Sequence, residues 1–309
     1  MTRVYIDGSA GTTGLRIRER LAVRGDLDVL TLPDALRHDE TARRDMMASA
    51  DITFLCLPDD AAREAAAWAD ETDTVVIDTS TVHRTSEDWT YGFPELAGMR
   101  EKISASKRIA NPGCHATGFI SLVAPLVQAG LIGKNEILSC FSLTGYSGGG
   151  KKMIAQYEQE DRDPLLDAPR AYGLGQTHKH LPEMKIISGI EKEPVFCPVV
   201  APFYAGMEVI VPLMREQLKG SVNDAEEVYR SVYAKGLVRA VQGGDEGGFL
   251  SAGAFAGRDD LQVSVFGNED RILLTARFDN LGKGASGAAI QNMNLVLGLD
   301  EATGLVTGE

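Results

Sequence analysis

The first 110 residues alternate short apolar runs with segments of mixed polarity and helical spacing. The apolar runs are typical of strands and lie at 3–7, 28–32, 51–57 and 74–78, whereas helices are expected at 14–24, 39–49 and 59–70. The run 52–57 is almost entirely apolar, as expected of a strand that is buried on both faces. This alternation predicts a parallel sheet covered by helices.

Beyond about residue 135 the apolar runs become longer and alternate with polar positions. These runs lie at 136–143, 194–201, 206–212, 261–266 and 271–279, and helices are expected near 149–159 and 222–235. The pattern predicts a mainly antiparallel sheet with a helical cover. We therefore expect one domain over 1–110 and a second over 111–283, with a C-terminal helix over 284–300 that returns to the first domain.

Composition narrows the classes of partner. The 309 residues carry 31 Lys plus Arg against 44 Asp plus Glu, a formal net charge of −13, which disfavours nucleic acids and anionic membranes as partners. No targeting segment or apolar stretch long enough to span a membrane is present, so a cytoplasmic location is expected. The 33 glycines form no repeat, which indicates that individual positions need them.

Three glycines follow the first predicted strand at a spacing of three. Gly8, Gly11 and Gly14 stand where a helix is expected to begin, and such a turn lets a dinucleotide pyrophosphate approach backbone N–H groups. An ordinary glycine-rich turn is the alternative. Arg37, just after the second strand, is placed to meet the 2′-phosphate of NADP, although a solvated loop charge has the same pattern.

Cys114 follows the rigid turn Asn111-Pro112-Gly113 and precedes an apolar helical run. Unpaired N–H groups at a helix start stabilise a thiolate, which favours a nucleophile at neutral pH over a buried structural cysteine.

Two further segments carry candidate chemistry. His178 and His180 form an H-x-H pair suited to acid and base catalysis, with surface histidines or a metal site as alternatives, and His115 ranks below them. Residues 144–152 combine a hydroxyl, glycines and two lysines, and such a segment either holds an oxyanion or phosphate or forms a flexible turn.

Taken in order, these motifs resemble the short-type N-acetyl-γ-glutamyl-phosphate reductases along nearly the whole chain. The matching segments are GSAGTTG at 8–14, CLPDDAA at 56–62, DTSTVHR at 78–84, YGFPEL at 91–96, NPGCHATG at 111–118, TGYSGGGKK at 144–152, HKHLPEM at 178–184 and DNLGKGASGAAIQNMN at 279–294.

The resemblance implies an α/β enzyme with a Rossmann-type NADP-binding domain and an α+β catalytic and dimerisation domain, of the aspartate-semialdehyde dehydrogenase superfamily. Such an enzyme, an oxidoreductase of arginine biosynthesis, uses NADPH to reduce N-acetyl-L-glutamyl 5-phosphate to the 5-semialdehyde and phosphate through a cysteine thioester. A homo-oligomer, dimer or tetramer, and no metal are also implied.

The resemblance further assigns roles to individual residues. Cys114 is the nucleophile, with His178 narrowly preferred to His180 as the acid and base. The cofactor is expected to contact Gly8, Ser9, Gly11, Thr12, Thr13, Gly14, Arg37, Pro58, Ser80 and Asn280. The substrate and its phosphate are expected to contact Arg84, Asn111, Ser147 and Gly148.

Two other functions remain open at this stage. Another acyl-phosphate reductase, acting on aspartate semialdehyde or in a lysine pathway, would share the chemistry and differ in substrate. A nucleotide-binding sensor without hydride transfer is the other, and the joint presence of Cys114, the histidine pair and Arg84 argues against it.

Overall fold

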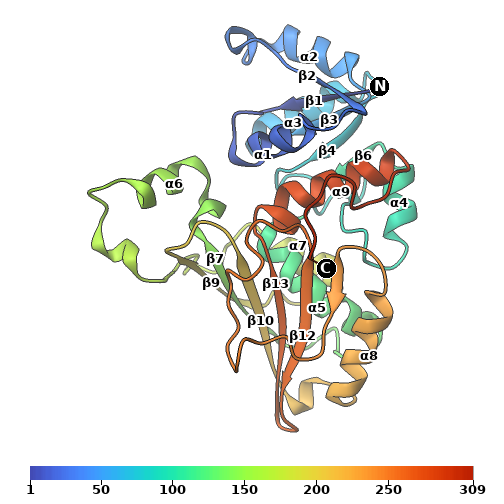
Figure 1. Cartoon of the computed structure of the whole chain (residues 1–309). Coiled ribbons are helices and arrows are strands. Elements are labelled where there is room, and N and C mark those ends of the chain that lie inside the picture. Colours follow the sequence, from blue (N-terminus) through green and yellow to red (C-terminus); the bar gives the residue numbers. More distant parts are fainter. Residues whose placement is uncertain (309) are drawn as a thin grey trace. The chain divides into compact units, whose positions relative to one another are not determined.

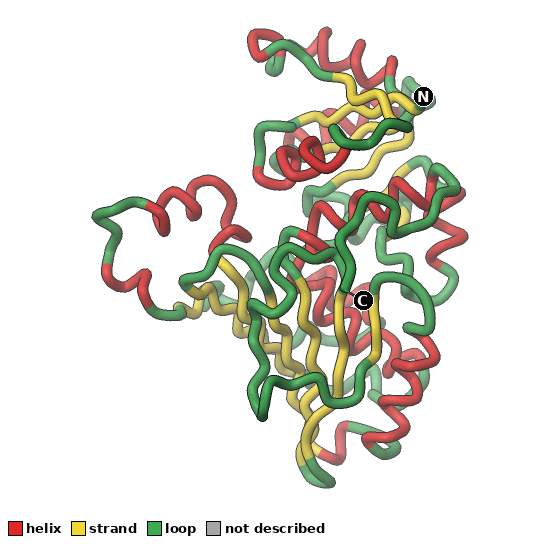
Figure 2. Tube along the Cα trace, viewed as in Figure 1, coloured by secondary structure: helices red, strands yellow, loops and turns green. Residues whose placement is uncertain are grey.

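The computed structural model describes residues 1–308, which form two compact units (Figure 1). Unit 1 consists of residues 1–94, 98–112 and 285–305, and unit 2 consists of 95–97, 113–284 and 306–308. Each unit contains its own sheet and helices, as Figure 2 shows by colour. The predicted fold class, an α/β chain with two different sheets, is confirmed.

The sheet of unit 1 is parallel throughout, as its sequence pattern predicts. Its six strands have the order β2-β1-β3-β4-β6-β5. β3 is buried along its whole length, in agreement with its apolar sequence. The strands are β1 (Thr2–Asp7), β2 (Leu27–Leu30), β3 (Ile52–Leu55), β4 (Val75–Asp78), β5 (Thr90–Tyr91) and β6 (Arg108–Ala110).

Helices cover both faces of this sheet because the strand residues alternate between two apolar cores. Val4 and Ile6 face a core shared with α1 (Thr12–Leu21), α4 (Met99–Ala105) and α9 (Gly287–Val296). Tyr5 faces the opposite core, shared with α2 (Glu40–Ser49) and α3 (Asp59–Ala69). The last helix begins later than the sequence predicts, because residues 282–286 form a π-helical turn before it.

The sheet of unit 2 is mainly antiparallel, as predicted, and has seven strands in the order β11-β12-β13-β10-β7-β9-β8. Among the described residues, only the pairs β11–β12 and β7–β9 of this sheet are parallel. The strands are β7 (Ser139–Gly145), β8 (Arg170–Ala171), β9 (Val195–Ala201), β10 (Met207–Met214), β11 (Val238–Ala240), β12 (Leu261–Gly267) and β13 (Arg271–Phe278).

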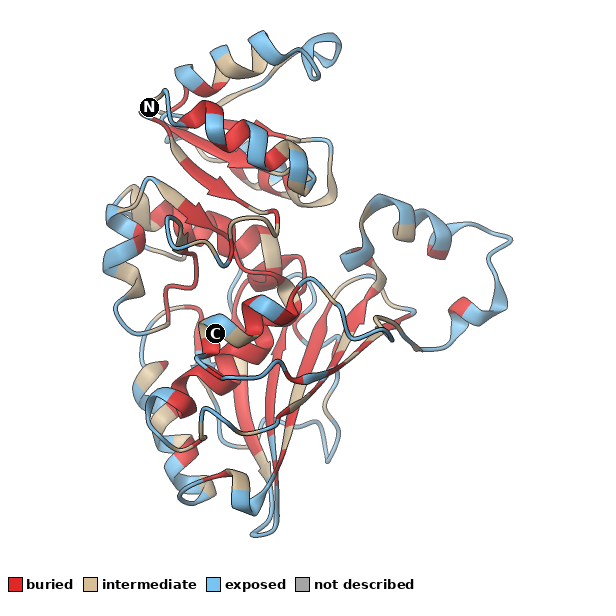
Figure 3. Cartoon of the chain, turned by 180° about the vertical axis from the view of Figure 1, so that it is seen from behind, coloured by how far each residue is buried: buried red, intermediate tan, exposed pale blue. Residues whose placement is uncertain are grey.

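One face of the second sheet is covered by helices. The apolar helix α5 (Cys114–Gln128) packs on β10 and β13, with α7 (Leu181–Ser188) and α8 (Val222–Val232) beside it. A segment containing α6 (Gly150–Glu158) projects from the sheet and is largely exposed, as Figure 3 shows in pale blue. Among the helices of residues 1–308, none combines the length and apolarity needed to cross a membrane.

Candidate active site

The turn after β1 in unit 1 needs glycine at two of its three predicted positions. Gly8 has a φ of +87°, and a Cβ there would lie 2.3 Å from the carbonyl oxygen of Cys56. A Cβ on Gly14 would lie 2.5 Å from the oxygen of Gly8. Gly11, the N-cap of α1, would meet nothing closer than 3.5 Å. Packing therefore explains Gly8 and Gly14, whereas Gly11 leaves open space where the helix begins.

A cleft of about 520 Å³ lies alongside this turn. It is lined by the ends of β1 and β2, by Ser9 and Gly11 of the turn and by Pro58 after β3. Ligands of parallel α/β sheets bind beyond the carboxyl ends of the strands, and the N–H groups that begin α1 attract anions. Thr12 and Thr13 are the first residues of that helix. The turn and cleft thus fit the pyrophosphate of a dinucleotide.

Four basic side chains line the same cleft, namely Arg18, Arg37, His38 and Arg43. Arg43 is engaged within the protein, because its NH2 group lies 2.9 Å from the carboxylate of Asp7. Arg37 is exposed at the cleft, where the sequence predicts contact with a 2′-phosphate. The three arginines outnumber the two carboxylates of the lining, Asp7 and Asp34, so the local charge is favourable to an anion in spite of the net negative charge of the chain.

The loop after β4 is ordered by the buried carboxylate of Asp78. This carboxylate accepts hydrogen bonds from the N–H and hydroxyl of Ser80, and it lies 2.7 Å from Nδ1 of His83. His83 in turn stacks on Trp89, with ring centroids 4.0 Å apart. Sequence reasoning included Ser80 but missed Asp78 and His83, although both lie in the DTSTVHR segment.

Arg84 and Asn111 lie together at the ends of β4 and β6. The Arg84 guanidinium donates from Nε to the carbonyl oxygen of Asn111 and from NH2 to that of Thr79, both at 2.9 Å. The side-chain amide of Asn111 donates to the carbonyl oxygen of Ala285. Both residues, predicted to contact substrate, thus also brace the loops at this edge of the sheet.

In unit 2, Cys114 is the first residue of α5, as the sequence predicts. The preceding N–H, that of Gly113, donates to Oε1 of Glu183 at 2.8 Å, and Glu183 is buried on α7. Within the same helix, a Cβ on Gly118 would lie 2.4 Å from Cγ2 of Val209, so glycine lets α5 approach β10. The half-buried thiol therefore lies at the positive end of a helix that contacts α7 through Glu183 and β10 through Gly118.

Three of the five histidines gather around one aromatic cluster in this unit. The rings of His178 and His180 lie 4.8 Å apart, and each lies 5.5 Å from the ring of His115. Nδ1 of His178 accepts the N–H of His180 at 3.2 Å. A neutral His178 ring therefore carries its proton on Nε2, where it can be donated.

His115, ranked below the pair by sequence reasoning, is the most deeply buried of the three. Its Nδ1 lies 2.6 Å from the hydroxyl of Ser142 and its Nε2 lies 2.6 Å from the phenol of Tyr172. Burial, with a smaller contribution from His178, lowers the pKa of His115 to about 3. The ring is therefore neutral at pH 7, and it holds Tyr172 in place.

Electrostatics link this cluster to the thiol. Burial, followed by the charge of Cys114, raises the pKa of the Tyr172 phenol above its usual value. Burial and the ammonium of Lys179 lower the pKa of His178 below 6.5. Both groups consequently keep their neutral, proton-donating forms near neutral pH.

Asn280, Ser147 and Gly148 meet in unit 2. The amide of Asn280 donates to the Ser147 hydroxyl at 3.0 Å and accepts the N–H of Gly206 at 2.9 Å. A Cβ on Gly148 would lie 3.5 Å from the same amide nitrogen. The structure thus brings together one residue predicted to contact cofactor and two predicted to contact substrate.

Comparison with known proteins gives the family of the chain. The family profile described as "Semialdehyde dehydrogenase, NAD binding domain" matches residues 29–106, and that described as "Semialdehyde dehydrogenase, dimerisation domain" matches 114–280. Solved aspartate semialdehyde dehydrogenases share the fold. The enzyme from Vibrio cholerae, complexed with ASA, has a TM-score of 0.71 at 18% identity over 96% of this chain and 98% of its own. That from Francisella tularensis has a TM-score of 0.71 at 15% identity, covering 96% of this chain and 100% of its own.

Curated relatives are much more similar in sequence. The N-acetyl-gamma-glutamyl-phosphate reductases of Brucella ovis and Brucella canis are each 46% identical over 306 residues, which cover 96% of this chain and 99% of the relative. With a nicotinamide-cofactor domain and a semialdehyde dehydrogenase fold, the chain belongs to the N-acetyl-gamma-glutamyl-phosphate reductase family.

Proposed function

We propose that this chain catalyses the NADPH-dependent reduction of N-acetyl-L-glutamyl 5-phosphate to N-acetyl-L-glutamate 5-semialdehyde and phosphate. The observation that carries the proposal is the position of Cys114 at the start of α5, beside Tyr172 and the histidine cluster, in a chain of this family. The relatives are named for this reaction, and this chain matches 99% of their length.

In the first step, the Cys114 thiolate attacks the acyl carbon and the bond from that carbon to the phosphate oxygen breaks. The departing phosphate takes up one proton, and a thioester to Cys114 remains. The N–H groups that begin α5 stabilise both the thiolate and the oxyanion that develops on the acyl oxygen. The hydrogen bond from Gly113 to Glu183 holds these donors in place.

The second step releases the aldehyde. The nicotinamide cofactor supplies a hydride when bound. Hydride transfer leaves a thiohemiacetal oxyanion, which the N–H at Nε2 of His178 stabilises. The proton of the neutral ring lies on Nε2 because Nδ1 accepts the N–H of His180. Cleavage of the carbon–sulfur bond then returns the Cys114 thiolate, so that one proton is consumed overall, in phosphate release.

The cleft of unit 1 supports the proposed preference for NADP. Arg37 is an exposed cation on the cleft wall, suited to a 2′-phosphate, and this favours NADP. Gly8, Gly11 and Gly14 supply the turn for the pyrophosphate, with Ser9, Thr12, Thr13 and Pro58 around it. Ser80 and Asn280 complete the proposed cofactor contacts, and Arg84, Asn111, Ser147 and Gly148 the substrate contacts.

We also infer that the chain forms a homodimer through unit 2. The strand residues that point away from α5 present an apolar surface, on which Phe141 is 52% exposed and Val195 50%. Patches of this kind on an otherwise covered sheet mark interfaces between subunits. The family profile that matches this unit is described as a dimerisation domain.

The substrate assay runs in the reverse direction, following phosphate-dependent reduction of NADP or NAD with N-acetylglutamate semialdehyde or aspartate semialdehyde. A higher kcat/KM for N-acetylglutamate semialdehyde, with strict dependence on phosphate, is expected. A preference for aspartate semialdehyde would contradict the substrate assignment, and equal rates with NAD would contradict the cofactor assignment.

A further inference from the structure

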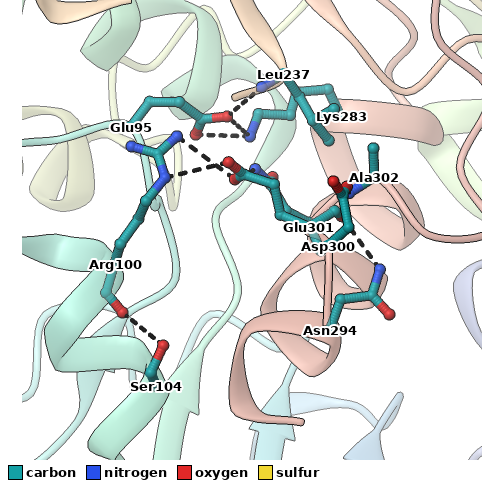
Figure 4. Close-up of polar contacts among 10 residues, drawn as sticks. Glu95, Arg100, Ser104, Leu237, Lys283, Asn294, Asp300, Glu301 and Ala302 are labelled. Carbon is teal, nitrogen blue, oxygen red and sulfur yellow. Dashed lines mark hydrogen bonds and ion pairs between the residues drawn. The ribbon is translucent and has the colours of Figure 1, made fainter. Parts of the chain in front are cut away.

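A fully buried ion pair lies within unit 2 and has no part in the mechanism described above. Nζ of Lys283 lies 2.8 Å from both carboxylate oxygens of Glu95, and the two side chains are 1% and 0% exposed. The N–H of Leu237 donates to Oε1 of Glu95 at 3.0 Å. Figure 4 shows the Lys283 ammonium and the Leu237 N–H directed at the same carboxylate.

Lys283 belongs to a turn that touches the nucleophile. It lies in the π-helical turn Gly282–Ser286, and the next residue, Gly284, has no room for a side chain. A Cβ on Gly284 would lie 2.9 Å from Cβ of Cys114 and 3.2 Å from the carbonyl oxygen of Asp279. The backbone beside Lys283 is therefore packed against the base of the Cys114 side chain.

The other end of this turn is fixed by Asp279. Its buried carboxylate accepts the N–H of Leu281 at 2.7 Å, and its carbonyl oxygen accepts the N–H of Gly284 at 3.0 Å. Asp279 thus anchors the turn before Lys283, and the ion pair with Glu95 anchors Lys283 itself. Together the two anchors hold the backbone at Gly284 beside Cβ of Cys114.

Stability alone does not account for such a pair. Removing two charges from water costs several kcal/mol, and apolar side chains of similar volume often stabilise a fold as well or better. A bidentate ammonium–carboxylate contact differs from an apolar contact in being directional. Its direction here fixes the segment that packs beside Cβ of Cys114.

We propose that Lys283 and Glu95 are positioning residues for the nucleophile: their ion pair holds the backbone at Gly284 against Cys114 and so restricts the thiol to its reactive orientation. The proposal rests on the proposed function only for its kinetic readout. The reactivity of the Cys114 thiol toward an alkylating reagent does not depend on which substrate the chain reduces. Alkylation therefore tests the positioning role even if the proposed substrate is wrong.

The test compares Lys283→Met with the double variant Lys283→Met/Glu95→Leu in the full chain. The single variant leaves a buried carboxylate unpaired, so both Tm and kcat should fall. The double variant has no unpaired charge, so Tm should largely return, while kcat and the rate of Cys114 alkylation by iodoacetamide remain at least about tenfold below wild type. The KM for the nicotinamide cofactor should stay unchanged.

Recovery of kcat and alkylation together with Tm in the double variant would overturn the proposal, because the pair would then serve stability alone. Glu95→Gln preserves the shape of the side chain and provides the same test if the other variants do not fold. A wild-type alkylation rate in this variant would contradict the proposal, and a reduced rate measured well below its Tm would support it.

The Arg100–Glu301 pair of unit 1, also drawn in Figure 4, is a matched control. Its atoms Nε and Oε1 lie 3.2 Å apart, and the two side chains are 29% and 18% exposed. Arg100→Met should lower Tm modestly and leave the alkylation rate of Cys114 unchanged. An equal loss of thiol reactivity in this variant would mean that any lost ion pair has the effect.

Discussion

In unit 1, the turn after β1 presents backbone N–H groups and, at Gly11, open space, whereas in unit 2 the surroundings of Cys114 are filled. Glu183, which is buried, accepts the N–H of Gly113, and Tyr172, which is half-buried, contacts the ring of His115. A site built from open space is damaged by added atoms, and a site built from packed polar groups is damaged by removed ones. Substitutions in the two units should therefore fail in different ways.

The largest expected effect comes from the thiol itself. Cys114→Ser replaces the nucleophile with a much weaker one of similar size, so turnover should fall by at least about 10³-fold. Binding of the nicotinamide cofactor, measured by fluorescence titration, should stay within about twofold of wild type, because the cleft of unit 1 is untouched. Undiminished turnover would refute the covalent mechanism.

Removal of a histidine should distinguish the two members of the pair. His178→Gln takes away the Nε2 proton and should lower kcat by about 10²-fold. His180→Gln retains the backbone N–H that orients His178, so its loss should be smaller. Steady-state kinetics of both variants, with Tm measured alongside, gives the comparison. The reverse order would move the acid and base role to His180.

His115 should make the stability of unit 2 depend on pH. Its pKa is about 3 in the folded chain and near 6.5 when unfolded, so the unfolded chain binds a proton that the folded chain excludes. Stability is therefore lost as pH falls below 6.5. Between pH 7 and pH 5, wild type should lose about 2 kcal/mol more unfolding free energy than His115→Gln. Urea denaturation at both pH values measures this difference, and equal losses would contradict it.

Substitutions at two glycines of the turn after β1 should affect stability and cofactor binding separately. Gly8→Ala meets both an unfavourable φ and the carbonyl oxygen of Cys56, so it should lower the unfolding free energy by about 1–3 kcal/mol. Gly11→Ala meets neither, so Tm should hold while the KM for NADPH rises about tenfold, or ~1.4 kcal/mol. An unchanged KM in Gly11→Ala would show that the pyrophosphate does not occupy this space.

The smallest effect is expected at the cleft wall. Arg37→Gln removes an exposed cation, so the preference for NADP over NAD should fall about fivefold, or ~1 kcal/mol. The ratio of kcat/KM values for the two cofactors measures it. Arg18→Gln, which removes another cation from the same cleft, controls for general charge loss. Equal shifts in both variants would argue against a specific contact with Arg37.

Local patterns predicted those features that depend on neighbouring residues. The start of α5 at Cys114 follows from the Asn-Pro-Gly turn, and the parallel sheet follows from the alternation of short apolar runs. The hydrogen bond between Gly113 and Glu183 joins residues 70 positions apart, and that between His115 and Tyr172 spans 57. No periodicity encodes such pairings, since they depend on how α5, α7 and the end of β8 pack together. Glu183 lies in the HKHLPEM segment, whose pattern predicts roles for the two histidines only.

The contribution of α9 to unit 1 has a consequence for synthesis on the ribosome. Ala289, Ile290 and Met293 of this helix belong to the apolar core that also contains Val4 and Ile6 of the first strand. One core of the sheet of unit 1 is therefore complete only after residues 289–293 have been synthesised. Premature termination shortly before α9 would release a chain whose second unit is almost fully translated but whose cofactor-binding unit exposes an unfinished apolar face.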